Sequence, residues 1–286
     1  MSRLRERMIE DMQLRGLSAN TQEAYVRVVC QLSDYIQHGP GKVTEEELRR
    51  YFLFLTKEKK VARSTATVAL CGIRFFCEYT LDRHWRILDL VRPGKEYKLP
   101  VVLSREEVRQ VLGEVRIPVY RACLTTIYSC GLRLMEGATL RVSDIDSARM
   151  VLHIRGAKGK RDRDVPLPEQ TLALLRDFWK THRSVEWLFP ASARRRLPAA
   201  EGPLNRDSLQ SAFYHAWKKT GIAKRAHIHT LRHSYATHLM EAGVHLLLIQ
   251  EILGHRSPRT TAIYTHLTRP VRESIRAPLR DIMKDL

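Results

Sequence analysis

The chain has 286 residues, of which 44% are hydrophobic, and a formal net charge of +18. This length suits two domains, the apolar content argues against disorder, and the positive charge points to a polyanion, with nucleic acid first and an anionic membrane surface second. No apolar run approaches the roughly 20 residues of a membrane span, and the first residues lack the apolar core of a signal peptide. We therefore expect a cytoplasmic, nucleoid-associated protein.

The first 90 residues have the periodicity of a small all-α unit. A short charged helix is predicted over 2–16, and a second helix over 18–37, where apolar residues repeat at three- and four-residue spacing. A third helix opens with acidic residues in its first turn, where the helix dipole favours them, and buries a stripe from Leu48 to Leu55. A fourth helix is expected to begin at a Ser64 cap. Its predicted buried stripe is Val68, Cys71, Ile73, Phe76 and Tyr79.

A break in this pattern marks the predicted domain boundary. Residues 91–95 include a Pro-Gly pair, and the basic sequence that follows to Pro100 reads as extended. We therefore expect a helical domain over 1–90, a linker over 91–100 and a second domain over 101–286.

The second domain is expected to combine helices with one β-hairpin. It opens with a capping box at Ser104–Glu107. Weak alternation over 150–154, a basic turn at 156–160 and a return strand over 163–167 predict the hairpin. An amphipathic segment closes the chain at 270–286. The predicted helices cover 119–130, 132–140, 168–182, 205–220, 229–242 and 245–253.

The stretch from Ala226 to His266 is dense in groups that can bind or move a phosphate. His229 and Arg232 lie three residues apart, so they share one face of a helix. Gly254–His255 closes the next apolar helical segment, and Tyr264 follows a Pro-containing turn. A cation, two imidazoles and a phenol at one point suit attack on a phosphodiester. The arginine would neutralise the oxygens, the histidines would donate hydrogen bonds or move a proton, and the phenol would be the nucleophile.

The motifs H-T-L-R-H-S-Y-A-T-H-L, L-G-H and Y-T-H in this stretch resemble the C-terminal signature of tyrosine recombinases, the phage-integrase family. Upstream, 130–136 resembles the family's first box, G-L-R-x-S-E, whose arginine contacts the scissile phosphate and falls here on Arg133. Met135 stands where the family usually has serine. The resemblance covers 103–268 and, more loosely, the helical start. It implies a mainly α protein with an N-terminal four-helix, SAM-like core-binding domain and a C-terminal α+β catalytic domain that holds a small β-hairpin.

The segment G-A-K-G-K-R-D-R-D-V-P-L is similar to the family's hairpin G-K-G-x-K-x-R-x-V-P-L. Counting back from Val165, the family's lysine falls on Lys158. Lys160 is the near alternative, because Ala157 is an extra residue in this turn. A lysine on a hairpin can protonate the departing 5′-oxygen as a general acid. The resemblance thus implies six catalytic residues, which are Arg133, Lys158, His229, Arg232, His255 and Tyr264.

The resemblance implies a metal-independent enzyme that cleaves and rejoins double-stranded DNA through a 3′-phosphotyrosyl intermediate and a Holliday junction. Such enzymes work as homo-tetramers on two sites, some with a second recombinase or accessory proteins, and their two domains form a C-shaped clamp around the duplex. The nearest sub-types are Xer, integron and mobile-element recombinases. Family members pass a C-terminal segment to a neighbouring protomer, so the apolar stripe of 270–286 is expected to dock in trans; the alternative is that it caps its own domain.

Two other functions remain open from the sequence. One is a nicking-closing enzyme similar to type IB topoisomerases, which would keep the fold without strand exchange. The other is a catalytically silent DNA-binding protein, although no catalytic residue is lost here.

No cofactor or metal is expected. The five cysteines are odd in number and form no C-x-x-C pair, so we interpret them as reduced core residues. His229 and His233 lie four apart and could ligate a metal, but Thr230 and Leu231 stand between them where H-E-x-x-H has its glutamate.

Overall fold

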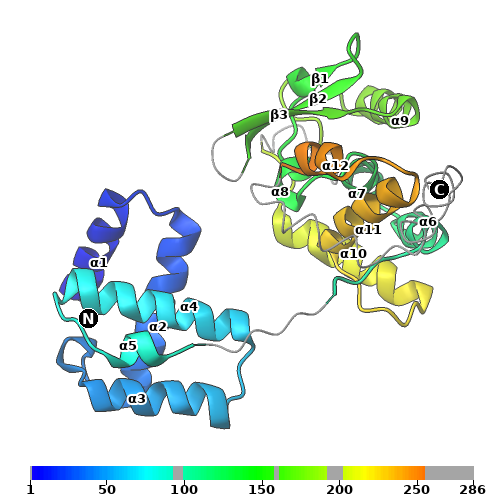
Figure 1. The fold of residues 1–286 in the computed structure, drawn as a ribbon. Coiled ribbons are helices and arrows are strands. Elements are labelled where there is room, and N and C mark those ends of the chain that lie inside the picture. Colours follow the sequence, from blue (N-terminus) through cyan, green and yellow to red (C-terminus); the bar gives the residue numbers. More distant parts are fainter. Residues whose placement is uncertain (1, 93–98, 158–160, 192–201, 255–286) are drawn as a thin grey trace, which may run out of the picture. The chain divides into compact units, whose positions relative to one another are not determined.

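The computed structural model forms two compact units, residues 1–98 and 99–286, which are described separately (Figure 1). None of the helices in its described part is both long and apolar enough to cross a membrane. The expected linker falls mostly outside this part, as do Lys158, His255, Tyr264 and the segment 270–286. The described residues are 2–92, 99–157, 161–191 and 202–254.

The N-terminal unit packs its helices around one apolar core. The third helix starts as expected, because Thr44 and Glu47 form a reciprocal capping box, and its predicted stripe from Leu48 to Leu55 is buried. A short helix that the sequence did not predict follows the fourth one. The helices are α1 (Ser2–Leu14), α2 (Ala19–Ile36), α3 (Glu45–Leu53), α4 (Arg63–Phe75) and α5 (Ile87–Leu90), with π-helical turns at Phe54–Glu58 and Phe76–Thr80.

The predictions for α4 were partly wrong. The helix begins at Arg63 after Ala62, which makes no side-chain cap, so Ser64 is not its cap. Its buried face includes Gly72, where α2 approaches so closely that an added Cβ would lie 3.2 Å from the Cα of Tyr25. Of the five residues named for this helix from the sequence, Ile73 and Phe76 are buried. The exposed members of the predicted stripe are Val68, Cys71 and Tyr79.

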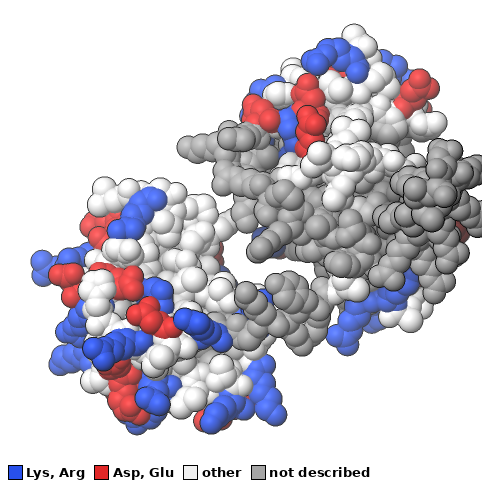
Figure 2. Space-filling model, in the orientation of Figure 1, with Lys and Arg blue, Asp and Glu red and all other residues white. Residues whose placement is uncertain are grey.

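Charge on the N-terminal unit is mixed. On the face shown in Figure 2, Lys and Arg side chains alternate with Asp and Glu around the unit. Some of these charges are paired on one helix, as in the Arg27–Glu23 contact of 2.7 Å on α2. Exposed pairs of this kind contribute little to stability, so both partners stay available to solvent and to ligands.

The C-terminal unit is built around α7, which packs against α9 and α11, and the expected hairpin is present. Three antiparallel strands form one sheet in the order β1-β2-β3, with Leu152 of β2 opposite Val165 of β3; both are buried. β1 was not predicted. The strands are β1 (Ile145–Asp146), β2 (Val151–Ala157) and β3 (Arg161–Pro166). The helices are α6 (Arg105–Glu114), α7 (Pro118–Ser129), α8 (Leu134–Ala138), α9 (Glu169–Lys180), α10 (Arg206–Thr220), α11 (Ile228–Glu241) and α12 (Leu246–Leu253).

A sharp reversal follows α7 and sets the start of α8. Gly131 has a φ of +61°, in the left-handed region, and Leu132 N donates to the Ile127 carbonyl at 2.9 Å. Arg133 then has extended backbone, so α8 begins at Leu134 and is shorter than the helix predicted over 132–140. The reversal places Arg133 next to Glu136, the acidic residue in the first turn of α8.

We predict that Gly131→Ala lowers the free energy of unfolding of the chain by about 3 kcal/mol, because a Cβ is strained at this φ and would overlap the ring of Tyr235. Gly113→Ala is the matched control, since nothing lies within 4 Å of an added Cβ at that position in α6. It should be neutral or stabilising by up to about 1 kcal/mol. Urea denaturation of both variants measures the difference, and equal effects would contradict the role given to Gly131.

Candidate active site

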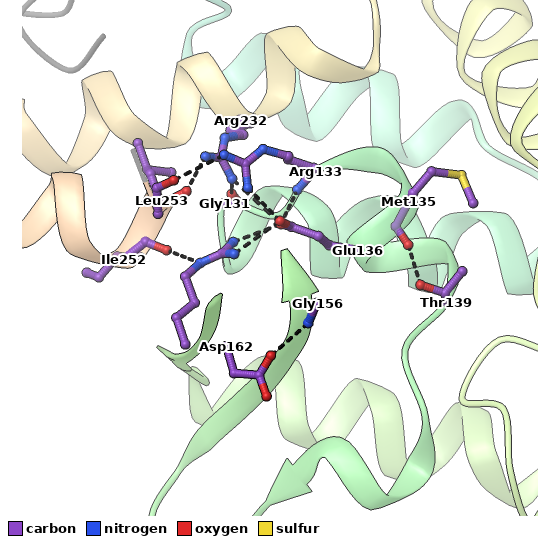
Figure 3. Close-up of polar contacts among 12 residues, drawn as sticks. Gly131, Arg133, Met135, Glu136, Thr139, Gly156, Asp162, Arg232, Ile252 and Leu253 are labelled. Carbon is purple, nitrogen blue, oxygen red and sulfur yellow. Dashed lines mark hydrogen bonds and ion pairs between the residues drawn. The ribbon is translucent and has the colours of Figure 1, made fainter. Parts of the chain in front are cut away.

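The carboxylate of Glu136, in the first turn of α8, is the centre of the site (Figure 3). It accepts hydrogen bonds from the backbone N and the Nη1 of Arg133 at 2.8 and 2.6 Å, and from Nη1 and Nη2 of Arg163 at 3.1 and 2.8 Å. Arg232 Nη1 lies 3.8 Å away. The Glu136 side chain is only 8% exposed. One carboxylate thus lies close to three guanidinium groups, from the residue before α8, from β3 and from α11.

Arg232 is the largest fully buried side chain of the described residues, with 1% exposure. Its Nη1 donates to the Gly131 carbonyl at 2.7 Å, and its Nη2 donates to the Leu253 carbonyl. A buried charge needs such partners, because the loss of its hydration is costly. The reversal at Gly131 therefore supplies one of the acceptors that fix this arginine.

The C-terminal end of α12 binds all three arginines through its backbone. The carbonyls of three successive residues, Ile252, Leu253 and Gly254, each accept a hydrogen bond from a different arginine. The Ile252 bond from Arg163 Nε is 2.8 Å long, and the Gly254 bond from Arg133 Nη2 is 3.2 Å long. These carbonyls have no partner within a helix and carry its negative dipole end. Guanidinium groups complement both properties.

His229 lies one turn before Arg232 on α11 and keeps a solvent-exposed side. Partial burial of its ring, together with the positive charge of Arg232 and the neighbouring His227, lowers its pKa to about 4. The ring is therefore neutral at pH 7 and can donate a hydrogen bond from one nitrogen. Its centroid lies 4.6 Å from that of His233, in an edge-on arrangement. No group of three or more His, Cys, Asp or Glu with the geometry of a metal site occurs in the described ranges.

The structure brings together three of the six predicted site residues, Arg133, His229 and Arg232; the other three lie outside the described part. Met135, which stands in place of serine, is 46% exposed and points away from Glu136 in Figure 3. Sequence reasoning assigned no role to Glu136 or Arg163. Each is a fixed position of a motif already quoted, the E of G-L-R-x-S-E and the R of the hairpin pattern, which could have singled them out.

The arrangement can bind an anion. Three cations face one carboxylate, so the site keeps a net positive charge, and Arg133 remains 27% exposed. Arginine suits a phosphate because its planar fork offers two parallel hydrogen bonds.

Burial alone would raise the pKa of Glu136, but the hydrogen bonds and charge of Arg163 and the bonds from Arg133 outweigh it and hold the pKa at about 2. In the unfolded chain the ordinary value is 4.5. Between pH 4.5 and about 2, the unfolded chain therefore binds a proton at Glu136 that the folded chain does not bind. The stabilisation from Glu136 is therefore fully present above pH 4.5 and is lost as the pH falls through about 2.

We predict that Glu136→Gln costs about 3 kcal/mol of unfolding free energy at pH 7, because it leaves buried guanidinium groups without a counter-charge. Urea denaturation of both proteins at stepped pH values measures this difference. It should shrink below pH 4.5, because the unfolded wild-type chain then binds a proton at Glu136 that the folded chain binds only near pH 2. A difference that stays constant from neutral pH down to about 3 would contradict the assigned charge state.

Two family models match the chain. One, described as phage integrase family, matches residues 102–270, and the other, described as phage integrase, N-terminal SAM-like domain, matches residues 4–87. Together they span both units.

Named relatives agree with these matches. A Sinorhizobium fredii protein named as an integrase/recombinase, y4qK, is 41% identical over 93% of this chain and 85% of its own length. The tyrosine recombinase XerD of Oceanobacillus iheyensis is 32% identical over 89% of this chain and 90% of its own length. A crystal structure of a lambda integrase tetramer bound to a Holliday junction has a similar fold, with a TM-score of 0.74 and 16% identity over 92% of this chain and 76% of that chain. The chain therefore belongs to the phage integrase family of site-specific tyrosine recombinases, enzymes that break and rejoin DNA.

Proposed function

We propose that the chain cleaves each DNA strand by attack of the Tyr264 hydroxyl on the scissile phosphate, which leaves a 3′-phosphotyrosyl bond and a free 5′-hydroxyl. The released strand end later attacks the phosphotyrosyl bond, so rejoining needs no ATP. The observation that carries this proposal is the pair Arg133 and Arg232, held over one carboxylate beside a neutral His229.

The proposed roles follow from the charge that develops during transfer. Negative charge concentrates on the phosphate oxygens, and preorganised arginines stabilise it. Neutral His229 would donate a hydrogen bond to one of these oxygens, and His255 would do the same or move a proton. The 5′-oxygen leaves as a strong base, so it needs a proton from Lys158, with Lys160 as the alternative donor.

We further propose that four copies act on two DNA sites and exchange one pair of strands at a time through a Holliday junction. The lambda integrase tetramer bound to a Holliday junction supports this, because its fold is similar to that of this chain. In each copy the helical domain 1–90 and the catalytic domain 101–286 would grip the duplex from both sides, joined by the linker 91–100. Since the substrate is DNA, we expect the enzyme in the cytoplasm, at the nucleoid.

The test of this proposal is Tyr264→Phe on DNA that carries the recombination site, sought as short inverted repeats around a spacer in the DNA flanking the gene. The variant should bind this DNA as the wild type does and form no covalent adduct, because it lacks the attacking oxygen. A suicide substrate and a denaturing gel measure the adduct. An SDS-stable adduct from the variant would show that another residue is the nucleophile.

We also propose that the apolar stripe of 270–286 docks on a neighbouring protomer. A chain truncated after Arg269 should then stay folded and bind single sites with unchanged affinity, but assemble two sites poorly. Mobility-shift assays with one and two sites separate these steps. If the truncated chain unfolds as a monomer, the stripe belongs to its own domain.

A further inference from the structure

Arg163, in β3, connects three segments of the site. Its Nε donates to the Ile252 carbonyl at 2.8 Å, and its two terminal nitrogens donate to the two oxygens of Glu136. A Cβ on Gly254 would lie 3.1 Å from Arg163 Cδ, so the arginine packs directly against that backbone. The side chain is 10% exposed. One nearly buried residue therefore joins the hairpin to α8 and to the end of α12.

The other two arginines do not depend on Arg163 for their contacts. Without it, Arg133 would keep its carboxylate and carbonyl partners, and Arg232 would keep both of its carbonyls. The hairpin, in contrast, would lose its three hydrogen bonds to Glu136 and the Ile252 carbonyl. In the described part of the chain, the hydrogen bonds that tie β2 and β3 to the site all come from Arg163.

The remaining polar contacts of the hairpin shape it without orienting it toward the site. Gly156 N donates to Asp162 Oδ1 at 2.8 Å, which lies within the hairpin itself. Arg155 Nε donates to Asp144 Oδ1 at 2.7 Å, which joins β2 to the 3-10 turn Val142–Asp144. These contacts would persist if the end of the hairpin moved relative to Glu136.

We propose that Arg163 is a positioning residue that fixes the β2–β3 hairpin against Glu136 and the end of α12. The inference rests on the proposed function, in which Lys158 or Lys160, between β2 and β3 in the sequence, protonates the departing 5′-oxygen. Proton transfer needs the donor within hydrogen-bond reach of the oxygen. Arginine suits the task because its planar fork binds both carboxylate oxygens and leaves Nε for a third bond.

The test compares Arg163→Met, which keeps the length of the side chain but removes all three hydrogen bonds, with Arg163→Lys, which keeps the charge. Arg155→Met is the matched control, because it removes an arginine of the same hairpin whose hydrogen bond goes to Asp144 and not to Glu136 or the end of α12. Single-turnover cleavage is measured on suicide substrates that have oxygen or sulfur at the 5′-bridging position. Sulfur leaves as a thiolate and needs little help from an acid. DNA affinity and melting temperature are measured in parallel.

Arg163→Met should bind DNA like the wild type and cleave the oxygen substrate on the order of 10²-fold more slowly, because the donor is displaced. It should recover most of this loss on the sulfur substrate. Arg163→Lys should give an intermediate loss with the same recovery, and Arg155→Met should match the wild type on both substrates.

Three results would overturn the positioning role. These are unchanged cleavage of the oxygen substrate, an equal loss on both substrates, and a loss of DNA binding in both Arg163 variants. Lys158→Ala and Lys160→Ala test the underlying function separately. If sulfur rescues one of them but not Arg163→Met, only the positioning role fails. If sulfur rescues neither lysine variant, the proposed acid is wrong and the positioning role fails with it.

Discussion

The contact between the Glu136 carboxylate and three guanidinium groups is the constraint on which the rest of the site depends. Arg232 could not be buried among cations alone, since like charges at short range in a poorly solvated interior repel strongly. One carboxylate removes part of that repulsion and leaves a positive excess. One negative charge against three positive charges therefore allows the arginines to be buried and still leaves the site positive. A site with no net charge would not attract the phosphates of DNA.

The end of α12 supplies the second part of the negative environment. Its carbonyls offer partial charge in fixed directions, whereas Glu136 offers a full charge. The chain leaves α12 through Gly254, whose φ of +62° turns it directly beside Arg163. The positions of the arginines and of the end of α12 are therefore set by the same few contacts.

Much of this organisation could be predicted from local patterns. Periodicity predicted most helices of both units, and the acidic turn after Thr44 and the capping box at Ser104 predicted the correct starts of α3 and α6. Predictions that depended on packing were less accurate. The face of α4 follows from the close approach of α2 at Gly72, and the two residues of β1 are a strand only because β2 pairs with them.

In the site, too, the residues in short motifs could be predicted and the contacts that depend on packing could not. Arg133, His229 and Arg232 could be named because the short motifs that contain them resemble those of the family. The role of Arg163 could not be predicted, because its partners Glu136 and Ile252 lie 27 and 89 residues away along the chain. The hairpin motif marks Arg163 as a fixed position, but it does not show that the side chain is buried or which groups it binds.

The arginine contacts at the end of α12 are made to peptide groups, and this affects how they can be detected. Replacement of Ile252 or Leu253 by another helix-forming apolar residue removes side-chain packing but leaves the carbonyl in place. An alanine scan of α12 would therefore not detect these hydrogen bonds, and any loss of stability would be attributed to side-chain packing alone. Replacing single amides by esters, which weakens the carbonyl as an acceptor without changing the side chain, would reveal them. Part of what binds the three arginines is therefore a set of peptide carbonyls. Every residue type carries this group, so the amino-acid sequence does not reveal the contacts.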